Sequence, residues 1–148
     1  MRSLVLALSI ATTLAAGCAS SQPEPSPSVS VPALLSIGGT VSVAGGVSQN
    51  GLDGEPCALA EAGYEDIRDG AQVVITDASS KTIAVGKLGP GKMRRPGGAD
   101  ASDRHCVFAF EVSAPRGHDF YGIEVSHRGR LQYTAAQLQA PLELTLGD

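Results

Sequence analysis

The chain has 148 residues, a length typical of one domain rather than two. Charged residues make up only 18% and glycine accounts for 18 residues, which favours a turn-rich β domain over a helical bundle. A net charge of −4 and the absence of tryptophan argue against a surface that binds nucleic acid.

The N-terminus carries the clearest signal in the sequence. A positively charged start precedes an apolar stretch from Leu4 to Leu14. This stretch is shorter than the about 20 residues of a membrane-spanning helix, so residues 1–17 are predicted to be an export signal. Residues 14–18 then read Leu-Ala-Ala-Gly-Cys, which resembles the lipobox of bacterial lipoproteins. The resemblance has one departure, because Ala15 stands where leucine is usual.

The lipobox resemblance implies a lipid anchor at Cys18. In such proteins the cysteine is diacylated on its sulfur and becomes the new N-terminus after cleavage. Two acyl chains hold a protein stably on a membrane, whereas one is marginal. The alternative is an ordinary signal-peptide cleavage that removes Cys18 or leaves it as a thiol. The resemblance implies that the mature chain is held by membrane lipid on the extracytoplasmic face of the cell membrane.

The residues after Cys18 are rich in serine and proline and show no apolar period as far as Pro32. Such a segment is expected to be extended and partly polyproline II, with a reach of ~40 Å from the lipid surface. The predicted organisation is a signal peptide over 1–17, a lipidated cysteine with a disordered tether over 18–35, and a folded domain over 36–148.

Apolar and polar residues alternate at period two through the folded domain, between clusters of turn-forming residues. This predicts an all-β fold, namely a seven-stranded antiparallel β-sandwich of immunoglobulin-like or transthyretin-like type. The predicted strands are Gly39–Ala44, Gln72–Thr76, Thr82–Leu88, His105–Val112, Phe120–His127, Arg130–Tyr133 and Leu142–Leu146. The rows expected to face the core are Cys106, Phe108, Phe110 and Val112; Tyr121, Ile123 and Val125; and Leu142, Leu144 and Leu146.

Three connections between strands are predicted from turn chemistry. The residues from Asp77 to Ser80 join the second strand to the third, and Arg128-Gly129 forms a tight turn between the fifth and the sixth. The sequence Thr-Ala-Ala-Gln at 134–137 fits a capping box, so one short helical turn is expected before Pro141.

Cys57 and Cys106 are expected to form a disulfide if the chain is exported. Such a bond closes a loop of about fifty residues and contributes roughly 4 kcal/mol in the chain-entropy model. Cys18 is then the odd cysteine, which lipidation accounts for. The functional alternative makes Cys106 a nucleophile assisted by His105, but neighbours on a strand point to opposite faces and cannot pair.

Two segments concentrate charge. Residues 53–69 carry six carboxylates with Arg68 as the only base, and this spacing does not match an EF-hand. A solvated acidic loop without metal is expected, and a Ca-dependent surface binder or hydrolase using this loop is the alternative function. Residues 86–98 hold four basic residues and no acid; they could contact lipid headgroups or wall polymers, pair with the acidic loop, or be mobile. The carboxylates are Asp53, Glu55, Glu61, Glu65, Asp66 and Asp69, and the basic residues are Lys87, Lys92, Arg94 and Arg95.

No motif for a nucleophile elbow, a zinc protease, a P-loop or a dinucleotide-binding turn is present in the sequence. The histidines lie on separate predicted elements with spacings unlike a metal site. They are His105, His118 and His127. The chain is therefore expected to be neither an enzyme nor a cofactor-binding protein.

Several segments together form a recognisable pattern. They are Cys57, Gly-Tyr-Glu-Asp-Ile at 63–67, the strand with its following aspartate at 72–77, Cys-Val-Phe-Ala-Phe at 106–110, Phe-Tyr-Gly-Ile-Glu-Val at 120–125 and Arg128-Gly129. This pattern resembles a group of small exported actinobacterial proteins and lipoproteins. The resemblance implies a Cys57–Cys106 bridge and a compact β domain, and it brings no catalytic residues with it.

Tyr64, Glu65 and Asp66 are the candidate binding residues, because a tyrosine in an acidic loop could face a ligand. The structural alternative is that Tyr64 and Ile67 pin the loop to the core. The function expected from the sequence is a membrane-anchored, non-enzymatic module that binds an envelope protein or a wall polymer through its loops or an open sheet edge.

Overall fold

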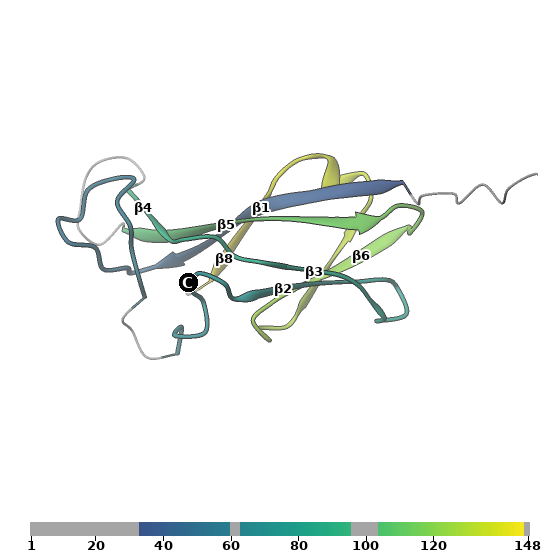
Figure 1. The fold of residues 1–148 in the computed structure, drawn as a ribbon, viewed down its shortest axis with the longest axis horizontal. Helices are drawn as coiled ribbons and strands as arrows, with labels where there is room; N and C mark the ends of the chain where they lie inside the picture. Colours follow the sequence, from purple (N-terminus) through teal and green to yellow (C-terminus); the bar gives the residue numbers. More distant parts are fainter. Residues whose placement is uncertain (1–32, 60–62, 96–103, 147–148) are drawn as a thin grey trace, which may run out of the picture. The chain divides into compact units, whose positions relative to one another are not determined.

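The computed structural model describes residues 33–59, 63–95 and 104–146. The predicted signal peptide, Cys18 and the predicted tether as far as Pro32 lie outside these residues. The described strands form two four-stranded sheets, ordered β4-β5-β1-β8 and β3-β2-β6-β7 (Figure 1). The elements are β1 (Leu34–Ala44), β2 (Gln72–Thr76), β3 (Thr82–Lys87), β4 (Lys92–Arg94), β5 (His105–Pro115), β6 (Phe120–Val125), β7 (Arg130–Thr134), the 3₁₀ turn η3 (Gln137–Gln139) and β8 (Leu142–Leu146).

The predicted apolar rows meet in one core between the sheets. Every predicted inward residue of β5 and β6 is buried, and so is Leu142 of β8, while Leu144 and Leu146 are partly buried. The hydroxyl of the buried Tyr121 donates a hydrogen bond to the carbonyl of Pro115 at 3.1 Å, which satisfies its one polar atom. The all-β sandwich predicted from alternation is confirmed.

The sandwich differs from the prediction in two respects. An eighth strand, β4, lies inside the segment 86–98 that was expected to be a loop, and its Met93 pairs with Cys106 and is fully buried. One strand pair is parallel, because β8 runs beside β1 with Leu144 opposite Val41. The chain enters β8 from β7 of the other sheet through η3. β8 is therefore not joined to β1 by a hairpin, which would make the two strands antiparallel.

Element boundaries differ from the prediction at both ends of the domain. β1 begins at Leu34, two residues before the predicted domain start at 36. β6 ends at Val125, and the turn that follows has positive φ at Ser126 (48°) and His127 (63°). The amide of Arg128 closes this turn on the carbonyl of Val125 at 3.0 Å. The tight turn is therefore centred on Ser126 and His127 and not on Arg128-Gly129.

The other two predicted connections are confirmed. The amide of Ser80 donates to the carbonyl of Asp77 at 3.0 Å in the turn between β2 and β3. Thr134 and Gln137 form the two reciprocal hydrogen bonds predicted for a capping box, but the N-cap residue of the 3₁₀ turn is Ala136. The amide of Gln137 donates to Thr134 Oγ1 at 3.3 Å, and the amide of Thr134 donates to Gln137 Oε1 at 2.8 Å.

The predicted Cys57–Cys106 disulfide is present, with 5.9 Å between the two Cα atoms. It holds the segment before β2 along the outer edge of β4, where the amide of Met93 donates to the carbonyl of Glu55 at 2.8 Å. Gly91 permits this close approach. A Cβ atom at Gly91 would lie 2.7 Å from the carbonyl oxygen of Cys57 and 2.8 Å from the sulfur of Cys106.

Replacing both Cys57 and Cys106 by alanine is expected to lower the free energy of unfolding by about 4 kcal/mol, because the bond closes a loop across a sequence separation of 49. Urea unfolding measures this loss. A Cys18→Ala variant, which keeps the bond, is the control and should unfold at the wild-type midpoint. A double variant that unfolds at the same urea concentration as the wild type would contradict the prediction.

Candidate functional site

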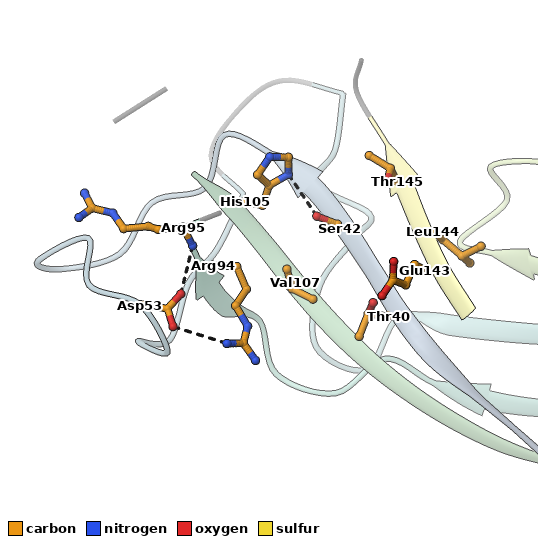
Figure 2. A pocket seen from close by; sticks show the side chains of 10 residues that line it. All are labelled: Thr40, Ser42, Asp53, Arg94, Arg95, His105, Val107, Glu143, Leu144 and Thr145. Carbon is orange, nitrogen blue, oxygen red and sulfur yellow. Dashed lines mark hydrogen bonds and ion pairs between the residues drawn. The ribbon is translucent and has the colours of Figure 1, made fainter. Parts of the chain in front are cut away.

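A groove of about 530 Å³ lies on the outer face of the β4-β5-β1-β8 sheet (Figure 2). Its volume is within the range of small-molecule sites. Strand alternation places it there. β1 buries Val41 and so turns Thr40 and Ser42 outwards, and the register puts Ser42 opposite Val107 of β5 and Thr145 of β8.

The middle of the groove carries hydroxyl and imidazole groups. Ser42 Oγ lies 3.1 Å from Nδ1 of His105, the outward residue at the start of β5. Thr40 is paired in register with Glu143, and Figure 2 shows these two side chains together at the β8 side of the groove. Hydroxyl groups therefore line the groove from β1 to β8, with a carboxylate at the β8 side.

The β4 side of the groove carries an ion pair. Arg94 Nη1 lies 3.5 Å from Asp53 Oδ2, and the amide of Arg95 donates to Asp53 Oδ1 at 3.1 Å. The side chains of Arg94 and Asp53 are 64% and 54% exposed, so their attraction is screened and contributes less than about 1 kcal/mol. Arg95 also lines the groove at this side. Arg94 is thus a hydrated, weakly held cation at this side.

The contact between Ser42 and His105 has the chemical identity of a nucleophile and its base, but its surroundings do not support acyl transfer. A triad needs a third group to orient the imidazole, together with N–H donors aimed at the developing oxyanion. The groove floor consists of β1 and β5, which pair with each other along their full described lengths. The backbone amides of these strands are used in hydrogen bonds between strands. These paired amides are therefore not free to serve as oxyanion donors in the described part of the groove.

Tyr64, Glu65 and Asp66 do not line this groove. The guanidinium of Arg128 lies 4.6 Å from the centre of the Tyr64 ring, and its Nε donates to Asp66 Oδ2 at 2.9 Å. Arg128 also bonds the carbonyl of Gly63. Glu65 accepts a hydrogen bond from the amide of Gly63 at 2.9 Å. These contacts attach the loop to the β6–β7 turn.

The described carboxylates of the acidic segment lie in separate hydrogen-bonding environments. Asp53 faces Arg94, and Asp66 faces Arg128. A side-chain hydrogen bond from Asn50 lowers the pKa of Glu55 below its ordinary value. Glu61 lies outside the described residues. Across 33–59, 63–95 and 104–146, no three histidine, cysteine or acidic side chains come together as a metal site would require.

The basic segment is divided between two strands. Lys87 ends β3, whereas Lys92 and Arg94 belong to β4. Of the three roles considered for this segment, contact with the acidic segment is the one seen, through Arg94 and Asp53. Residues 96–98 lie outside the described part of the chain.

Thr40, Ser42, Glu143 and Thr145 were missed as site residues by the sequence analysis. Each alternates with an inward residue of a correctly predicted strand, and this alternation was the signal that could have found them. The pairing of β1 with β8 was not predicted, so nothing in the pattern brought Thr40 and Glu143 together.

Replacing Arg128 by glutamine is expected to lower the free energy of unfolding at pH 7 by about 1 kcal/mol, because the loop loses an ion pair and a cation–π contact. The hydrogen bond from Arg128 lowers the pKa of Asp66. The stabilisation is therefore present above the carboxyl pKa of the unfolded chain, about 4, and is lost as the pH falls through the lower pKa of the folded state.

Urea unfolding of the wild type and this variant across pH should show their difference shrinking in acid. Arg68→Gln, which removes the same charge from the same loop, is the matched control and should change stability little, because the Arg68 side chain is exposed. A difference between wild type and Arg128→Gln that stayed constant from neutral to strongly acidic pH would contradict a role for the Asp66 carboxylate.

Millimolar Ca²⁺ is expected to leave the thermal unfolding midpoint unchanged, because Asp53, Glu55 and Asp66 already have separate partners. An ion bound by the folded state alone would raise the midpoint. Thermal melting with and without Ca²⁺ measures this, with Mg²⁺ as the control ion. A midpoint that rises with Ca²⁺ but not with Mg²⁺ would support a calcium site in 53–69.

The described part of the chain contains no helix long and apolar enough to cross a membrane. The resemblance to lipoproteins and to small exported actinobacterial proteins rests on the residues that carry it in the sequence. No protein-family model, curated protein or solved structure matches this chain.

Proposed function

We propose that this protein is a lipid-anchored, extracytoplasmic binding module that carries out no chemistry of its own. Its β-sandwich domain presents the outer-face groove, and acylated Cys18 holds the chain at the cell membrane. The expected partner is a component of the cell envelope, such as an envelope protein or a wall polymer.

One observation carries this proposal, namely the Cys57–Cys106 disulfide. Disulfides persist in oxidising compartments and are rare in the cytosol, so the bond supports export. The chain has three cysteines, and the bond uses both of those in the folded domain. Cys18 is the third, and it stands at the end of the lipobox-like sequence, where acylation accounts for it.

The binding role is supported by the character of the groove. It offers hydroxyl groups, a carboxylate and a hydrated guanidinium on a rigid sheet surface. A site on paired strands is held more precisely than a site on loops. The serine- and proline-rich segment after Cys18 supplies a spacer between such a surface and the membrane.

Intact mass spectrometry of the chain extracted from membranes tests the anchor. The expected mature chain begins at Cys18 and carries the mass of a diacylglycerol group on that residue. A Cys18→Ala variant should move from the membrane fraction to the soluble fraction, and a Ser20→Ala variant should remain with the membrane. A chain that begins after Cys18, or that keeps Cys18 unmodified, would rule the anchor out.

A further inference from the structure

The outer-face groove is lined mainly by polar residues. Only Val107 and Leu144 among its lining residues are apolar, and none is phenylalanine, tyrosine or tryptophan. An apolar molecule would remove water from Thr40, Ser42 and Thr145 without replacing the hydrogen bonds of their hydroxyl groups, which is unfavourable. A ligand for this surface must therefore present many hydrogen-bonding groups of its own.

The groove also lacks the features that recognise peptides. Extended peptides bind by adding a strand to an open sheet edge, or by inserting apolar side chains into pockets. The floor of this groove is built from β1 and β5, which are interior strands with partners on both sides. Hydroxyl groups of sugars match this lining better than a peptide does.

The charges of the groove lie on its opposite sides. Arg94 belongs to β4 and Glu143 to β8, so three strand spacings, about 14 Å, separate the strands that carry them. The guanidinium of Arg94 already faces a carboxylate, that of Asp53, across an exposed contact of 3.5 Å. A carboxylate brought by a ligand can take this place with charge-assisted hydrogen bonds. Glu143 can accept hydrogen bonds from hydroxyl groups at the other side.

From these features we propose that the groove binds an acidic glycan, an extended chain of sugar units that carry carboxylates. A ligand carboxylate binds Arg94 at the β4 side. Sugar hydroxyl groups bond to Ser42 and Thr40 in the middle and to Glu143 at the β8 side. This assignment rests on the proposed binding role and names the chemical class of its ligand.

Isothermal titration calorimetry of the full chain with three probes tests the assignment. The probes are trigalacturonic acid, the neutral sugar maltotriose, and the peptide triglutamate, which has the charge of the first without its hydroxyl groups. Trigalacturonic acid is expected to bind about tenfold or more tightly than either of the others, because each lacks one of the two kinds of recognised group.

Variants show where the probe binds. Arg94→Gln is expected to weaken trigalacturonic acid about tenfold and to leave maltotriose unchanged. Glu143→Ala should weaken maltotriose, because the variant removes the group that accepts hydrogen bonds from sugar hydroxyls. Arg130→Gln removes the same charge from β7 of the other sheet, outside the groove, and should leave all affinities at the wild-type value.

Three results would overturn the assignment. Equal affinity for maltotriose and trigalacturonic acid would show that the groove does not recognise the carboxylates of the ligand. Equal affinity for triglutamate would show an acidic peptide or a general anion site instead. Absence of binding by a chain that unfolds at the normal urea midpoint would exclude glycans. The anchor fails separately, because sugar binding with an unmodified Cys18 would overturn the anchor and leave the ligand class intact.

Discussion

The alternation of β5 is the constraint on which the rest of the structure depends. Cys106 and Phe108 point inwards, so they supply the disulfide and part of the core. His105 and Val107 therefore point outwards, and they line the groove. A shift of β5 by one residue would exchange these two sets and would destroy the core, the bond and the groove together.

The disulfide also positions one side of the groove. The bond at Cys57 holds the preceding residues along β4, where the amide of Gly54 donates to the carbonyl of Met93 at 2.8 Å. This places Asp53 beside Arg94 at one side of the groove. An oxidising compartment is thus needed for a bond that also positions part of the groove.

The contrast between the groove and the loop at 63–69 shows why candidate residues were hard to recognise from the sequence. Tyr64 and Asp66 suggested a binding feature because they are polar and aromatic residues in a loop. Their partner Arg128 is 62 residues beyond Asp66, and it was assigned only to a turn. The sequence analysis did not single out Thr40, Ser42 and Thr145 of the groove, because outward threonine and serine are ordinary in strands. Residue type suggests which side chains could bind a ligand. Contacts with residues distant in the chain decide whether those side chains already have partners within the protein.

The sequence by itself determined the local features of this protein. Alternation identified the inward rows of β5 and β6, and Thr134 with Gln137 identified the capping box, because each depends on neighbours within one strand or one turn. Only the tertiary structure decided that β4 forms at the edge of β5, that β8 lies parallel to β1, and that Arg94 and Glu143 lie on opposite sides of one groove. These features depend on which strands become neighbours, and packing between segments distant in the chain sets that arrangement.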